Sequence, residues 1–161
     1  MLLERISSPQ DVKDLEPCDL PILCEEIRRA ILVSSASVGG HIGSNLGVVE
    51  LTVALHRVFD SPHDKIVFDV SHQTYAHKML TGRASNYLDP SEFGGLSGFS
   101  NPDESEHDLF SVGHTSTSVS LACGMAKARD LKDEDYRVVA VIGDGSLSGG
   151  LAFEGFDALA E

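Results

Sequence analysis

An apolar run of strand length, Val138-Val139-Ala140-Val141-Ile142, leads directly into Gly143-Asp144-Gly145. Such a run is typical of a strand buried in a parallel sheet, and the glycines predict a tight turn at its carboxyl end. Open α/β sheets bind ligands at that edge. The carboxylate of Asp144 suits a hard cation such as Mg²⁺, which takes few protein ligands and adds phosphate oxygens and water. An ordinary strand-to-helix turn explains Gly-Asp-Gly alone equally well, so the rest of the chain must decide.

Composition limits the classes of function. The 161 residues are 42% hydrophobic and 23% charged, which is typical of a globular protein with a core of its own. A net charge of -13 argues against nucleic-acid binding, which needs a basic surface. No apolar run reaches the length of a membrane span, and no secretory signal is visible. The three cysteines lack metal-ligand spacing and predict reduced, mostly structural thiols, with Cys24 and Cys123 in the core, so a cytoplasmic protein is expected.

Helix and strand patterns alternate along the chain. Residues 1–20 predict an arm or a short helical lead-in, and 65–70 and 137–142 predict buried strands. Helices are predicted over 21–37 (Asp19 as N-cap, Pro21 in the first turn), 48–59, 74–80, 117–131 and from 148 onward, with loops over 39–45 and 82–110. The alternation predicts the α/β class, with a three-layer, doubly wound, mostly parallel sheet. No strand pattern follows 137–142, so we expect the sheet to be incomplete and the chain to be part of a larger protein.

Three histidines lie in predicted loops beside small residues: His41, His72 and His114. One such histidine is usually a packed or solvated side chain, but three in similar settings favour proton transfer or contacts to substrate oxygens. Their wide spacing argues against zinc. His56, His63 and His107 lack such a setting and are expected to be surface residues. Three cationic residues could help to hold phosphate, although charged residues on exposed helices and loops are usually solvated: Lys65, Lys78 and Arg83.

The segment Gly113-His114-Thr115-Ser116-Thr117-Ser118 opens a predicted helix. Its unpaired amides and hydroxyls, together with the helix dipole, predict an anion site. A simple serine or threonine cap would explain one of these hydroxyls but not four in succession.

Together these motifs resemble the 1-deoxy-D-xylulose-5-phosphate synthase family, thiamine-diphosphate enzymes of the transketolase superfamily. The resemblance begins near residue 39, covers about three-quarters of the chain, and is carried in family order by Gly40–Leu51, Asp69–Lys78, Thr81–Arg83, Gly94–Phe99, Ser111–Ser118 and Gly143–Gly145. It implies two parts: an N-terminal arm and helix over 1–38, and the N-terminal part of the diphosphate-binding domain over 39–161. Gly-Asp-Gly marks the wider thiamine-diphosphate group, whereas the His72-Gln73 and Gly113–Thr117 blocks point to the synthase.

The resemblance also implies a role for each site residue. Asp144 would bind Mg²⁺ at the cofactor's diphosphate, and His41, His72 and His114 would handle proton transfer and substrate oxygens. Residues lining the cofactor would be His72, Gly113, His114, Thr115, Gly145 and Ser146. The reaction implied is condensation of pyruvate with glyceraldehyde 3-phosphate with loss of CO₂, feeding isoprenoid (terpenoid), thiamine and pyridoxal biosynthesis, in a homodimer. The carbanion chemistry belongs to the cofactor.

Four positions depart from the family pattern without removing a catalytic group: Asn45, Ser71, Ala76 and Thr115, where serine, glycine, proline and serine are commoner. The family's later asparagine, glutamate and phosphate-binding arginines lie beyond Glu161, so the 161-residue chain alone is expected to be inactive. Two alternatives stay open: a split transketolase-like subunit that needs a second chain, and a truncated binding or dimerisation module without activity.

Overall fold

A computed structural model describes residues 1–160 and divides the chain into two compact units. Unit 1 comprises Met1–Asp60 and His72–Gly98, and unit 2 comprises Ser61–Ser71 and the chain from Phe99 onward. Unit 1 is helical, and unit 2 contains the two strands. The α/β class is therefore confirmed, with a small parallel sheet, while a three-layer doubly wound sheet and the division after residue 38 stay predictions.

Unit 1 is built around helix α2, Leu20–Val38, the longest helix in the described part of the chain. Its apolar positions Leu23, Ile27 and Ile31 recur every four residues and are fully buried, as expected for a helix with one face in the core. The helical lead-in also contributes to this core through Leu3 and Val12, both fully buried. The other helical elements of unit 1 are η1 (Leu3–Arg5), α1 (Pro9–Lys13), α3 (Ile42–Leu46), α4 (Val49–Val58), α5 (Tyr75–Lys78), η2 (Met79–Arg83) and α6 (Ser85–Leu88).

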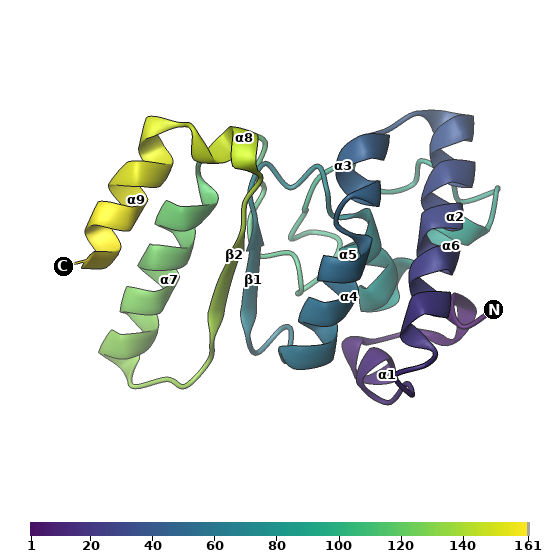
Figure 1. The fold of residues 1–161 in the computed structure, drawn as a ribbon, viewed down its shortest axis with the longest axis horizontal. Helices are drawn as coiled ribbons and strands as arrows, with labels where there is room; N and C mark the ends of the chain where they lie inside the picture. The colour runs from purple at the N-terminus through teal and green to yellow at the C-terminus, as the bar shows by residue number, and fades with distance from the viewer. Residues whose placement is uncertain (161) are drawn as a thin grey trace. The chain divides into compact units, whose positions relative to one another are not determined.

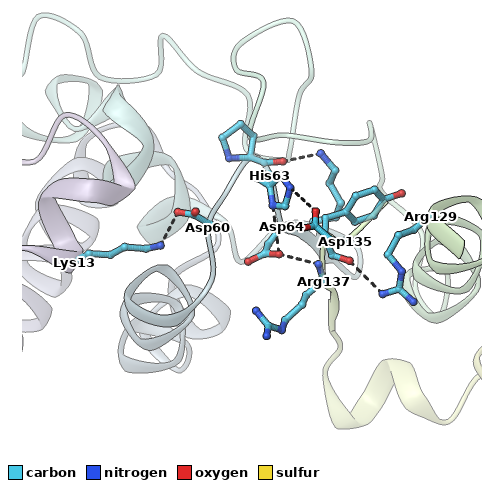
Figure 2. Close-up of polar contacts among 10 residues, drawn as sticks. Lys13, Asp60, His63, Asp64, Arg129, Asp135 and Arg137 are labelled. Carbon is cyan, nitrogen blue, oxygen red and sulfur yellow. Dashed lines mark hydrogen bonds and ion pairs between the residues drawn. The ribbon is translucent and has the colours of Figure 1, made fainter. Parts of the chain in front are cut away.

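In unit 2, strands β1 (Lys65–Phe68) and β2 (Val138–Val141) pair in parallel, with Lys65 opposite Val138 and Phe68 opposite Val141. Figure 1 shows them side by side, with α7 and α9 adjacent to each other. At the start of the pair, the Asp64 carboxylate accepts a hydrogen bond of 2.8 Å from the Arg137 amide (Figure 2). The helices of unit 2 are α7 (Ser118–Lys132), α8 (Asp144–Leu147) and α9 (Gly150–Ala160).

Most predicted elements are confirmed within two residues of their ends, including Pro21 in the first turn of α2. The predicted loops over 39–45 and 82–110 are wrong in part, because α3 occupies Ile42–Leu46 and α6 occupies Ser85–Leu88. The final helix is preceded by the short α8, which starts at Asp144 itself. None of the helices within residues 1–160 is long and apolar enough to cross a bilayer.

Several polar residues expected on the surface are buried. His56 is fully buried, and its Nε2 lies 2.9 Å from Nδ1 of the buried His77. Lys78 is also fully buried, and its Nζ donates to the Ser97 carbonyl oxygen at 2.8 Å. Arg83 is buried beside Thr81, and His107 is half-buried against the Ser61 hydroxyl. The prediction of solvated side chains was therefore wrong for these residues, whereas His63 is exposed as expected. Cys24 and Cys123 are buried, as predicted.

Close packing of α7 against α9 yields a stability prediction. A methyl group on Gly155 would lie 2.9 Å from Val119 Cγ1 and 3.0 Å from the Ser120 amide nitrogen, closer than side chains normally approach. We expect Gly155→Ala to lower the free energy of unfolding by about 1 kcal/mol, measured by denaturant titration.

Gly124→Ala is the matched control, since Gly124 lies within α7 and has no atom within 4 Å of an added methyl group. Better helix propensity should stabilise that variant by about 0.5–1 kcal/mol. Equal stabilisation of both variants would contradict the close contact between the two helices.

Candidate active site

In unit 1 the structure brings together two of the three predicted histidines. His41 lies between α2 and α3, and His72 lies just before α5. Their ring centroids are 5.2 Å apart, with the rings nearly perpendicular at 83°. Both residues are half-buried.

Asn45 holds these two histidine segments together. Its Nδ2 donates to the carbonyl oxygens of His41, at 2.5 Å, and His72, at 2.8 Å. Its Oδ1 accepts from the Tyr75 amide at 2.9 Å. The side chain is fully buried, and it binds both donor and acceptor groups of the backbone, as a primary amide can. Asn45 was noted in the sequence only as a departure from serine, and its role was missed.

Tyr75 fixes the orientation of His41. The Tyr75 hydroxyl accepts a hydrogen bond from the His41 amide at 3.1 Å and lies 3.5 Å from His41 Nδ1. Gly40 makes this approach possible: its φ is +141°, and a Cβ there would lie 2.8 Å from the hydroxyl oxygen. The absence of a side chain at position 40 therefore leaves room for the contact between the Tyr75 hydroxyl and His41.

A hollow of about 300 Å³ borders His41. Ser35, Asn86 and Ser97 contribute polar groups to its wall, and Tyr75 and Tyr87 contribute aromatic rings. The Ser35 hydroxyl is buried and has no hydrogen-bond partner within the described chain. No Lys, Arg, Asp or Glu is found among the described residues that line the hollow, so its chemistry favours uncharged groups.

In unit 2 the predicted cofactor residues lie on two segments at one end of the β1–β2 pair. One segment precedes α7 and carries Gly113, His114 and Thr115; the other follows β2 and carries Asp144, Gly145 and Ser146. The Ser116 hydroxyl donates to the Ser146 carbonyl oxygen at 2.5 Å, which joins the two segments. The ends of the two strands therefore bring these two segments together.

Asp69, immediately after β1, lies beneath both segments. Its two carboxylate oxygens accept hydrogen bonds of 2.9 Å from the amides of Ser116 and Ser118, and the side chain is 1% exposed. Burial alone would raise the Asp69 pKa, but these amides and the hydroxyls of Ser146 and Ser118 outweigh it and hold the pKa below its ordinary value. Two of the amides predicted to bind an external anion are thus occupied by the protein's own carboxylate.

The residues that remain open to a ligand fit a metal-bound diphosphate. Gly113, His114, Thr115 and Asp144 are exposed, and Ser146 is half-buried. No atom lies within 4 Å of where a Cβ would be at Gly113, Gly143 or Gly145, so the backbone there can be approached closely. Within residues 1–160 no three His, Cys, Asp or Glu side chains gather into a metal-binding group. A single carboxylate suits Mg²⁺, which takes its other ligands from phosphate and water.

Comparison with known proteins identifies relatives over nearly the whole chain. A family model described as 1-deoxy-D-xylulose-5-phosphate synthase matches residues 3–161. Proteins named 1-deoxy-D-xylulose-5-phosphate synthase from Carboxydothermus hydrogenoformans and Symbiobacterium thermophilum are 59% identical over 153 residues and 58% identical over 157 residues. These alignments cover 95% and 98% of this chain but 25% and 24% of the relatives, so the chain spans about a quarter of their length.

The arrangement around Asn45 predicts a large effect of one charge. Asn45→Asp retains the shape of the side chain but replaces a donor to two carbonyl oxygens with a carboxylate oxygen. We expect a loss of about 3 kcal/mol in the free energy of unfolding at neutral pH, measured by denaturant titration. Asn86→Asp serves as the control, since Asn86 makes one long bond of 3.5 Å to the Glu92 carbonyl oxygen. Similar losses of stability in both variants would contradict the role of Asn45 in holding the His41 and His72 segments together.

The lowered pKa of Asp69 predicts how stability depends on pH. A carboxyl with a depressed pKa stabilises the folded state above its unfolded pKa of about 4, and this contribution disappears as pH falls through the folded pKa. The wild type should therefore exceed Asp69→Asn by a constant amount, about 3 kcal/mol, between about pH 5 and pH 7, and by progressively less below about pH 4. Unfolding titrations across this range measure the difference. A stability difference between wild type and Asp69→Asn that grows as the pH falls would contradict a lowered pKa for Asp69.

Proposed function

Because the chain belongs to the 1-deoxy-D-xylulose-5-phosphate synthase family, we propose that it supplies part of an active site that condenses pyruvate with glyceraldehyde 3-phosphate, with loss of CO₂. The product is 1-deoxy-D-xylulose 5-phosphate, a precursor for isoprenoid (terpenoid), thiamine and pyridoxal biosynthesis. Thiamine diphosphate and Mg²⁺ are the proposed cofactors. The observation that best supports this proposal is the hydrogen bond between Ser116 and Ser146, which joins the segment before α7 to the Gly-Asp-Gly segment.

Residues of unit 2 are proposed to hold the diphosphate end of the cofactor. The exposed Asp144 carboxylate would bind Mg²⁺, and Gly145 and Ser146 would lie close to the metal-bound diphosphate. Gly113, His114 and Thr115 would line the cofactor with backbone and side-chain polar groups. When bound, the thiazolium supplies the carbanion chemistry, which no amino-acid side chain can provide.

Residues of unit 1 are proposed to act on the substrates. His41 and His72 are close enough to contact the same small molecule, and an imidazole can donate or accept a proton near neutral pH. Tyr75 fixes the His41 ring, which reduces the reorganisation needed during proton transfer. The hollow beside His41 would receive an uncharged part of a substrate, because no described lining residue carries a cationic Lys or Arg side chain for phosphate.

The wider architecture is also a proposal. We infer a homodimeric, cytoplasmic enzyme in which β1 and β2 belong to a larger, doubly wound parallel sheet. The family membership supports these points. The parallel pairing of the two strands supports the larger sheet.

Asp144→Ala in the full-length protein tests the proposal. We expect the variant to lose Mg²⁺-dependent binding of thiamine diphosphate and to form product at least about 100-fold more slowly, because the metal loses its protein ligand. Calorimetry with thiamine diphosphate and a chromatographic assay for 1-deoxy-D-xylulose 5-phosphate measure the two effects. Asp157→Ala is the control, since it removes the same charge from an exposed position in α9.

The alternatives predict different results. A binding or dimerisation module without activity would show no difference between the two variants and no product. A split subunit would form product only after mixing with a second chain. Neither result is expected if the full-length protein is itself the synthase.

A further inference from the structure

We propose that Asp69 is a positioning residue of the cofactor site, which holds the segments before α7 and after β2 in their ligand-binding conformation before the cofactor arrives. This inference rests on the proposed function of those segments. Asp69 itself is 1% exposed and would not touch the cofactor.

The contacts of Asp69 converge from both segments. The amides of Ser116 and Ser118 bind different carboxylate oxygens, each at 2.9 Å, so the carboxylate bridges the start of α7. The Ser116 hydroxyl donates to the carbonyl oxygen of Ser146, two residues after Asp144, so the residue whose amide Asp69 holds is also joined to the segment after β2. One buried side chain therefore restrains groups next to His114 directly and groups next to Asp144 through Ser116.

Backbone conformation shows why such an anchor is needed. Ser116 has a φ of +70°, a left-handed conformation that is unfavourable for a residue other than glycine. Its amide is held by Asp69 and its hydroxyl by the Ser146 carbonyl oxygen. Gly149 allows this arrangement, since a Cβ there would overlap the Ser116 hydroxyl. Without the carboxylate, Ser116 would lose one of its two restraints, and cofactor binding would have to restore the order.

Charge adds to the effect of geometry. Amides in the first turn of a helix have no partners within the helix, and the helix dipole favours a negative charge beside them. Asp69 supplies that charge to the 15-residue helix α7. A neutral asparagine at this position keeps the size of the side chain but loses the charge and can accept fully at only one of its two terminal atoms.

The chain provides a matched control at the other end of the same strand. Asp64 is 5% exposed and accepts a 2.8 Å hydrogen bond from the Arg137 amide, just before β2 (Figure 2). Asp64→Asn and Asp69→Asn thus remove the same charge from two buried carboxylates that bind backbone amides. Only Asp69 contacts the proposed ligand-binding segments.

The test is calorimetric titration of the full-length protein with thiamine diphosphate at saturating Mg²⁺, well below the melting temperature of each variant. We expect the Kd to rise at least about tenfold for Asp69→Asn and to change less than about twofold for Asp64→Asn, although both variants melt earlier. Turnover of Asp69→Asn at saturating cofactor should stay within a few-fold of wild type, because the groups that contact the cofactor are unchanged.

Asp69→Glu is the second variant if Asp69→Asn does not fold. It keeps the charge but lengthens the side chain, so the carboxylate cannot accept from both amides at their present distances of 2.9 Å, and we expect a two- to fivefold rise in Kd. Equal Kd values for wild type and Asp69→Asn, or for wild type and Asp69→Glu where only that variant folds, would overturn the positioning role. A wild type that binds no thiamine diphosphate would instead overturn the proposed function.

Discussion

Parallel pairing of β1 with β2 determines which polar groups of unit 2 can meet. The register places Phe68 beside Val141, so the chain leaves both strands at one edge. Asp69 follows the first strand, and the Gly143-Asp144 turn follows the second after one intervening residue. The amides at the start of α7 reach the same edge, where Asp69 binds them. A four-residue pairing thus creates the setting in which one carboxylate can organise two loops.

The contacts of Asp69 change the role expected for the amides at the start of α7. Amides in such a position commonly bind phosphate, and the hydroxyl-rich sequence before α7 suggests that role. Here a carboxylate from the protein already occupies two of these amides, so they serve the conformation of the segment. A diphosphate would have to be held by other means, and a metal ion on Asp144 would also offset the negative charge of Asp69. The proposed Mg²⁺ would therefore reduce the repulsion between Asp69 and the diphosphate as well as bind the diphosphate itself.

Sequence patterns predicted the long elements well, because Leu23, Ile27 and Ile31 repeat at helical spacing and the two strands are continuous apolar runs. The short helices α3 and α6 were missed, since their five and four residues are too few to show such a repeat. His56 was misplaced on the surface, although it lies seven residues after the buried Val49 and so on the same face of α4. The expectation that His41 and His72 act together came from the family resemblance. The roles of Asn45 and Asp69 depend on tertiary contacts that no local sequence pattern indicates.

In each unit one buried side chain holds backbone groups of separate segments, but the side chain is a hydrogen-bond donor in unit 1 and an acceptor in unit 2. In unit 1 the groups that must be gathered are chiefly backbone carbonyl oxygens, those of His41 and His72, and the residue that gathers them is an amide donor, Asn45. In unit 2 the groups are amides, those of Ser116 and Ser118, and the residue is a carboxylate. Asn45→Asp and Asp69→Asn would each leave buried polar groups facing the wrong partner. In each unit the proposed functional residues thus depend on one buried side chain whose hydrogen-bonding polarity matches the backbone it holds, and neither side chain needs to contact the substrate or the cofactor.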